Sequence, residues 1–163
     1  MTGTSGRILI VDDERKIRVI MAQILADEGF EVAEAESGEQ ALELAGGFDP
    51  DVIIMDQNMP GMNGIETLKA IRSRRPEQTA IILTAYGSIP LAVEAIKNGA
   101  YDYLTKPFDN DELLIVLRRA IEHSRLAGEV IRLRGELKEK YRFENIIGAS
   151  PAMQRLFEKS RCM

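Results

Sequence analysis

Short apolar runs alternate along the chain with segments in which apolar residues recur at helical spacing. Three runs rich in isoleucine and valine occupy residues 8–11, 52–55 and 80–83, and a fourth strand-like segment occupies 101–104. Runs almost unbroken by charge are typical of parallel strands that are buried on both faces of a sheet. Residues 31–35 are more polar, which predicts a further strand at an edge of the sheet.

Five helices are predicted between and after these strands. The first lies between Asp13 and Gly29 and has an apolar stripe made of Ile17, Ile20, Met21, Ile24 and Leu25. The second runs from Ser37, an N-cap, to about residue 44, where Gly46 and Gly47 end it. The others are predicted over about 64–74, over about 89–98 with Gly99 as a left-handed stop, and from Asp109, another N-cap.

The order of elements is a strand followed by a helix, repeated five times. Right-handed crossovers turn this order into a doubly wound parallel α/β sheet with helices on both faces. The five-stranded flavodoxin-like form has the strand order 2-1-3-4-5, with a topological switch between strands one and three. We therefore predict this order.

The fifth helix has no strong breaker between Asp111 and Tyr141. Its apolar residues Leu126, Val130, Leu133 and Leu137 recur at spacings of four and three, between charged neighbours. This pattern predicts a coiled-coil seam that joins two copies of the chain. A solvated linker helix without a partner remains the alternative, because Gly128 and Gly135 each cost about 1 kcal/mol of helix propensity.

Length and composition set the domain organisation and exclude several classes of protein. We predict a compact domain over residues 1–122, a helical dimerisation linker over 123–142 and the truncated start of another domain over 143–163, since so short a piece cannot bury its own core.

The net charge of −5 disfavours nucleic-acid binding by this portion. A single cysteine, Cys162, excludes an intramolecular disulfide and a thiolate zinc cluster. The chain contains no membrane-spanning apolar run and no signal peptide, so a cytoplasmic protein is expected.

Polar residues of complementary chemistry follow the predicted strands. Asp12 and Asp13, Asp56, Thr84 and Lys106 come at or just after four strand ends. The carboxyl ends of parallel strands face one crevice, so we expect these side chains to meet there. A carboxylate can attack phosphorus if cations neutralise the charge, as Mg²⁺ held by carboxylates and a lysine would. The pattern predicts a phosphoryl and magnesium site.

Each of these residues also has a plainer interpretation when taken alone. An Asp-Asp pair can cap a helix, Thr84 can be a turn residue, and Lys106 can be a solvated loop lysine. Lys106 precedes Pro107, and a cis bond there would turn the lysine into the crevice. Alternation along a strand predicts that Tyr101 and Tyr103 share a face, and leaves open whether Tyr103 is fixed or moves.

The chain resembles the receiver domain of bacterial two-component response regulators over about residues 7–122. The similar segments are residues 10–14, Asp56 with 59–64, 84–87 and 103–108. The resemblance implies that Asp56 accepts a phosphoryl group from a sensor histidine kinase. It also implies that Asp12, Asp13, Asp56 and the backbone carbonyl of Asn58 bind Mg²⁺, with Thr84 and Tyr103 as a switch pair. Gln57-Asn58 departs from the family pattern, in which an apolar or basic residue is common.

Residues 84–87, the long helix and residues 143–153 also resemble the NtrC-like subfamily. In that subfamily the linker leads to an AAA+ ATPase that activates sigma-54 RNA polymerase, and then to a DNA-binding domain. The resemblance implies that phosphorylation switches a linker-mediated homodimer and so controls a transcription activator. No phosphate-loop motif G-x-x-x-x-G-K-[ST] occurs in this sequence, so we do not expect it to hydrolyse ATP. We expect a phosphoacceptor that phosphorylates itself from a donor, not a turnover enzyme.

Two rival functions remain. A phosphatase of the haloacid dehalogenase type also combines a nucleophilic aspartate with magnesium, threonine and lysine. Those enzymes are similar to one another in having a general-acid aspartate two residues after the nucleophile, where this chain has Asn58, an amide that cannot cycle a proton. The other rival is a plain dimerisation stem in which the acidic crevice has no role.

Overall fold

The structure is a computed structural model that describes residues 6–85 and 88–147, with side chains up to residue 137. The chain divides into two compact units, one ending at Leu126 and the other beginning at Ala127. Most of the further domain predicted over 143–163 lies outside the described residues. No helix within the described ranges is long and apolar enough to cross a membrane.

The first unit is built on a five-stranded parallel sheet. Its strands are β1 (Arg7–Val11), β2 (Glu31–Ala35), β3 (Val52–Asp56), β4 (Thr79–Thr84) and β5 (Asp102–Thr105). They are hydrogen-bonded in the order β2-β1-β3-β4-β5, and every neighbouring pair is parallel. The predicted flavodoxin-like order is therefore confirmed, with the polar strand β2 at an edge.

Within the described ranges a helix follows each strand. These helices are α1 (Arg15–Asp27), α2 (Gly38–Phe48), α3 (Gly64–Arg74), α4 (Ile89–Lys97) and α5 (Asn110–Ile147). Both predicted N-caps are confirmed, since Ser37 accepts a hydrogen bond from the Gln40 N–H and Asp109 accepts one from the Glu112 N–H. Gly99 ends α4 with a φ of +102°, a conformation that favours glycine.

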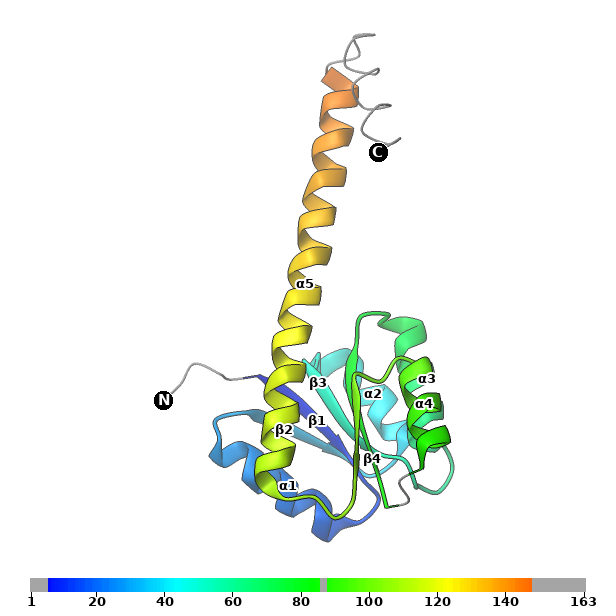
Figure 1. The fold of residues 1–163 in the computed structure, drawn as a ribbon. Coiled ribbons are helices and arrows are strands. Elements are labelled where there is room, and N and C mark those ends of the chain that lie inside the picture. The colour runs from blue at the N-terminus through cyan, green and yellow to red at the C-terminus, as the bar shows by residue number, and fades with distance from the viewer. Residues whose placement is uncertain (1–5, 86–87, 148–163) are drawn as a thin grey trace. The chain divides into compact units, whose positions relative to one another are not determined.

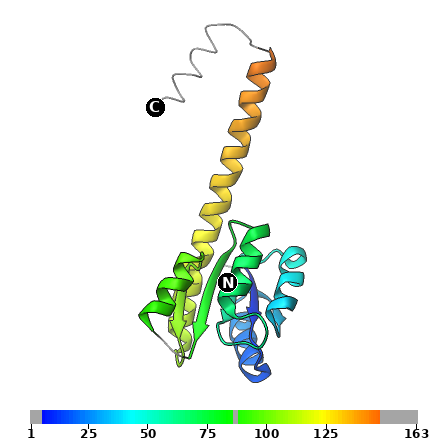
Figure 2. The same ribbon diagram turned by 90° about the vertical axis from the view of Figure 1, so that its right-hand side faces the viewer.

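The helices cover both faces of the sheet, as Figures 1 and 2 show for α1 and α5 on one side and for α2, α3 and α4 on the other. Alternate residues of the strands fill two separate cores. Ile10 and Ile54 pack towards Leu25 of α1 and Leu117 of α5. The neighbouring residues Leu9, Ile53 and Met55 pack with Ala41, Leu68 and Ala95 of the other three helices. Burial on both faces explains why the central strands show no polar alternation.

Two details of the first helices differ from the sequence-based predictions. Ile20, predicted to lie in the inward stripe of α1, is 59% exposed, because the buried face of this helix is narrow and centred on Met21 and Leu25. Helix α2 does not end at Gly46 and Gly47 but continues to Phe48, which packs on the core, and Asp49 adopts the left-handed cap conformation. The low helix propensity of the two glycines is thus outweighed by the packing of the Phe48 ring against the core.

The predicted common face of Tyr101 and Tyr103 is also wrong. Tyr101 packs against the core under α1 and α5, whereas Tyr103 packs against the core under α2, α3 and α4. Strand β5 begins only at Asp102, so strand alternation does not extend to Tyr101. The Tyr101 ring instead lies 4.8 Å, centroid to centroid, from the ring of His123 on α5.

Helix α5 is longer than the predicted linker, since it continues past Arg142 to Ile147. The added residues 143–147 contain no glycine or proline, and the next glycine in the sequence is Gly148. The predicted seam residues Leu126, Val130, Leu133 and Leu137 are between 46% and 57% exposed. The apolar seam therefore has no cover among the described residues.

Candidate functional site

The carboxylates of Asp12, Asp13 and Asp56 gather at the carboxyl end of the sheet. Asp12 directly follows β1 and Asp56 ends β3, and these strands are hydrogen-bonded neighbours. One carboxylate oxygen from each of the three residues lies within 4.8 Å of the others. Asp12 and Asp56 are 0% and 4% exposed, while Asp13 is exposed. The topological switch thus brings together the carboxylates that were predicted to meet, with one open to solvent.

Lys106 supplies a positive charge to the two buried carboxylates. It follows β5, and its peptide bond to Pro107 is cis. The Lys106 Nζ atom lies 3.5 Å from Asp12 Oδ2 and 3.5 Å from Asp56 Oδ1. The backbone is fixed as well, because the Lys106 N–H donates to the Thr84 carbonyl at 2.7 Å. A lysine from the edge strand therefore reaches the centre of the acidic cluster.

Burial raises the pKa of the Asp56 carboxyl above its ordinary value. The Lys106 ammonium opposes this shift, the Asp12 carboxylate adds to it, and the Asn58 N–H, which donates to Asp56 Oδ1 at 3.4 Å, lowers the pKa slightly. Desolvation of a carboxylate beside a like charge disfavours its ionised form. Additional cationic charge at this place would favour ionised Asp56.

The donor set fits a hard divalent cation. Mg²⁺ prefers oxygen ligands, usually one or two carboxylates together with water molecules. Here two carboxylates are buried and oriented, with Asp12 Oδ1 held by the Glu14 N–H at 2.8 Å, and the exposed Asp13 leaves room for solvent ligands. The cluster has the chemistry of a magnesium site that combines protein and water ligands.

Thr84 and Tyr103 lie on the same face of the sheet. Thr84 is fully buried at the end of β4, and alternation places it on the face of Ile82, which belongs to the core under α2, α3 and α4. Tyr103 pairs in register with Ile82 and packs against that same core. The Tyr103 hydroxyl accepts a hydrogen bond from Thr105 Oγ1 at 3.5 Å. The two residues are thus diagonal neighbours on adjacent strands.

Gln57 and Glu39 form hydrogen bonds with residues 62–65, beside the cluster, and sequence reasoning assigned neither a role there. The Gln57 side chain is nearly buried, and its Oε1 accepts a hydrogen bond from the Ile65 N–H at 2.9 Å. Glu39 Oε1, from α2, accepts one from the Met62 N–H at 3.3 Å. No local sequence pattern predicts these hydrogen bonds, because Ile65 lies eight residues from Gln57 and Met62 lies 23 residues from Glu39.

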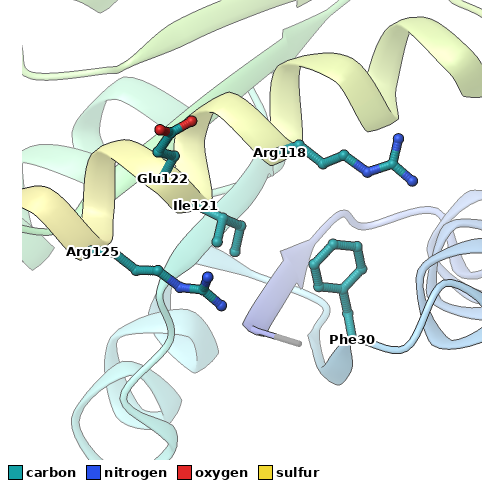
Figure 3. Close-up of a pocket in the computed structure, with 5 residues that line it drawn as sticks. All are labelled: Phe30, Arg118, Ile121, Glu122 and Arg125. Atoms are coloured by element: carbon teal, nitrogen blue, oxygen red, sulfur yellow. The ribbon is translucent and has the colours of Figure 1, made fainter. Parts of the chain in front are cut away.

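One pocket, of about 320 Å³, is separate from the acidic cluster. It is lined by Phe30, Arg118, Ile121, Glu122 and Arg125, and in Figure 3 Ile121 and Phe30 point towards one another while Glu122 points away from Phe30. Phe30 directly precedes β2, so the pocket lies at the amino ends of the strands. Arg118 also pairs with Glu28 at 3.3 Å. This pocket therefore takes no part in the carboxylate site at the opposite end.

Comparison with known proteins gives a family for this arrangement. Residues 8–118 match the model of the response regulator receiver domain. The chain is 42% identical over 148 residues to regulatory protein AtoC of Escherichia coli (strain K12), which covers 91% of this chain and 32% of that protein. It is 38% identical over 154 residues to the DNA-binding transcriptional regulator NtrC of the same strain, with coverage of 93% and 32%. The chain thus spans about a third of the length of these relatives.

Solved structures give the same result. NtrX from Brucella abortus in complex with ADP superposes with a TM-score of 0.73 at 38% identity, covering 80% of this chain and 29% of that one. The chemotaxis protein CheY4 of Vibrio cholerae superposes with a TM-score of 0.69 at 37% identity, covering 72% of this chain and 99% of that one. The family match, these relatives and the acidic cluster at the switch point together show that the chain belongs to the response regulator receiver domain family.

Proposed function

We propose that Asp56 is a phosphoacceptor that takes a phosphoryl group from a sensor histidine kinase. The observation that carries this proposal is the ammonium group of Lys106, 3.5 Å from both Asp12 and Asp56 in an otherwise acidic, buried site. A cation at this position is what a carboxylate needs in order to receive an anionic phosphoryl group. Membership of the receiver family favours this reading over the phosphatase.

In the transfer, an Asp56 carboxylate oxygen attacks phosphorus while the bond from phosphorus to the donor imidazole nitrogen breaks. The leaving imidazole takes up a proton, and the product on the receiver is an acyl phosphate. Lys106 neutralises charge on the phosphoryl oxygens as it now does on the Asp56 carboxylate. The hydroxyl group of the buried Thr84, at the end of the adjacent strand, donates a hydrogen bond to another phosphoryl oxygen.

Mg²⁺ would be held by the carboxylates of Asp12, Asp13 and Asp56 and by the backbone carbonyl of Asn58. The close approach of the three carboxylate oxygens supports this ligand set. When bound, the ion neutralises charge on the phosphoryl group and on the attacking carboxylate. The exposed Asp13 marks the side from which solvent and the donor reach the site.

We propose that Thr84 and Tyr103 carry the signal away from the site. When the Thr84 hydroxyl turns to the phosphoryl group, the shared face beside Tyr103 gains space, and the tyrosine moves inward from its half-buried position. The surface formed by α4, β5 and α5 would change with it. Helix α4 exposes Ile89, Val93 and Ile96 on this surface, so a partner could bind one state better than the other.

We also propose that the seam of α5 forms a parallel homodimer in register. Leu126 and Leu133 take the d positions and Val130 and Leu137 the a positions. Leucine at d with the β-branched Val130 at a favours a parallel two-stranded coiled coil. Glu129 then lies at g and Arg134 at the following e position, which face one another between parallel helices. An antiparallel pair would bring like charges together instead.

In a longer protein of the NtrC type, we propose that this module controls an AAA+ ATPase that acts on sigma-54 RNA polymerase at DNA. The support is the similarity to NtrC and AtoC over more than nine tenths of this chain. A switch in the receiver can reach such a domain because α5 continues without interruption from Asn110 to Ile147. A cytoplasmic location remains the accompanying expectation.

Incubation with acetyl phosphate and Mg²⁺, followed by mass spectrometry, tests the proposal. We expect one phosphoryl group per chain, on the peptide that contains Asp56, and none when Mg²⁺ is chelated. Asp56→Asn should abolish the label. Repeated turnover of a phosphomonoester would favour the phosphatase instead, and a chain that stays unlabelled under all conditions would favour the stem.

A further inference from the structure

We infer that Gln57 is a positioning residue for the loop of residues 58–63, which begins with the proposed metal ligand Asn58. Gln57 would act through the hydrogen bond from the Ile65 N–H to its side-chain oxygen. This inference rests on the proposed magnesium site. Gln57 stands directly between Asp56, the proposed phosphoacceptor, and Asn58, the proposed backbone ligand. Its side chain is only 8% exposed, although a glutamine next to a loop could reach solvent.

Gln57 is held at three points. Its N–H donates to the Leu83 carbonyl at 2.7 Å, its carbonyl accepts from the Gly64 N–H at 3.1 Å, and its Oε1 accepts from the Ile65 N–H at 2.9 Å. Two of these bonds satisfy the first N–H groups of α3, which have no partner inside the helix. Gln57 therefore holds the N-terminus of α3 next to the end of β3 through hydrogen bonds.

These bonds close the loop of residues 58–63 at its two ends. The approach is so close that a Cβ atom on Gly64 would lie 2.8 Å from the Asp56 carbonyl oxygen and 2.9 Å from Gln57 Oε1. Movement of the Gln57 side chain would let α3 shift relative to Asp56 and Asn58. Removal of a residue that orients a metal ligand through hydrogen bonds commonly lowers metal affinity by about tenfold or more.

Helix α3 offers a matched control, because the side chain of Asn63 caps the same helix through hydrogen bonds that do not involve Gln57. Asn63 Oδ1 accepts from the Glu66 N–H at 2.8 Å, and Glu66 Oε1 accepts from the Asn63 N–H at 3.0 Å. Loss of this cap weakens α3 in general. If Gln57 mattered only for helix stability, variants at the two positions would affect metal binding alike.

The test measures magnesium affinity by calorimetry and amide exchange at Ile65 by NMR, on the whole chain. Gln57→Met keeps length and volume but lacks a strong acceptor, and should weaken Mg²⁺ binding about tenfold and speed exchange at Ile65. Gln57→Glu keeps an acceptor oxygen and should retain both slow exchange and metal binding. Asn63→Ala should lower stability but leave magnesium affinity within about twofold of the parent.

Unchanged magnesium affinity in Gln57→Met, despite faster exchange at Ile65, would overturn the inference. An equal loss of affinity in Asn63→Ala would overturn it too. If Gln57→Met does not fold, Gln57→Asn replaces it, since an amide one methylene shorter cannot reach the Ile65 N–H. A parent chain that binds no Mg²⁺ at all would instead refute the proposed metal site, so the two failures are distinguishable.

Discussion

The Lys106 ammonium group lies 3.5 Å from the Asp56 carboxylate, although 50 residues of sequence separate them. The same nitrogen lies 3.5 Å from Asp12, so one cation serves two buried anions. Burial raises the pKa of the Asp56 carboxyl, and the Lys106 ammonium opposes that shift.

Lys106→Met removes the cation and should slow labelling of Asp56 by acetyl phosphate by roughly 100-fold at saturating Mg²⁺, the typical loss for one charge-stabilising group. It should also raise the pKa of Asp56 further. Lys69→Met, at an exposed position on α3, is the matched control and should label at the parent rate. Equal rates in the two variants would show that Lys106 does not act on the transferred group.

Asp56→Asn should stabilise the metal-free protein at neutral pH. The folded state holds the Asp56 proton more tightly than the unfolded state, so stability is lost as the pH rises through the raised pKa. Below the ordinary value of 3.8 both states are protonated, and the parent and the variant should differ little. Urea unfolding across this range, with a chelator present, measures the difference. Added Mg²⁺ should narrow it by stabilising the parent, which keeps all the proposed ligands, more than the variant.

Gly64→Ala should destabilise the protein by about 1–3 kcal/mol, because its Cβ atom would meet the backbone oxygen of Asp56 at 2.8 Å. Gly46→Ala is the matched control, since nothing lies within 4 Å of its Cβ position in α2. That change should raise the free energy of unfolding by about 0.5–1 kcal/mol. Denaturant unfolding of both variants gives the comparison, and destabilisation of similar size in both would contradict the close approach at Gly64.

Glu129→Arg should weaken the proposed dimer about tenfold by placing an arginine opposite Arg134 of the second copy. The double variant Glu129→Arg with Arg134→Glu should restore the parent affinity, since the pair is only exchanged. Sedimentation equilibrium measures both dissociation constants. In an antiparallel dimer, where Glu129 would face a like charge, the single change would not weaken association, and a parent chain that stays monomeric would favour the solvated linker helix.

The sequence alone determined the five strands, the strand order and the meeting of Asp12, Asp13 and Asp56. Short unbroken apolar runs such as 52–55 that alternate with helical segments are typical of strands buried on both faces, and right-handed crossovers leave few orders for them. Chain direction fixes which end of each parallel strand lies at the crevice, so the sequence alone predicts that residues at the carboxyl ends of the strands lie there. The caps at Ser37 and Asp109 were also predictable, because they depend on the next three residues.

Only the tertiary structure decided the features that depend on distant partners. The continuation of α2 through Gly46 and Gly47, the exposure of Ile20 and the opposite faces of Tyr101 and Tyr103 each follow from packing against another layer. The hydrogen bond between Gln57 and Ile65 has no local signal either. Strand periodicity and helix caps act over a few neighbouring residues, whereas burial and long-range hydrogen bonds are set by what the fold brings alongside, and this is why the loop beside Asp56 could not be read from the sequence.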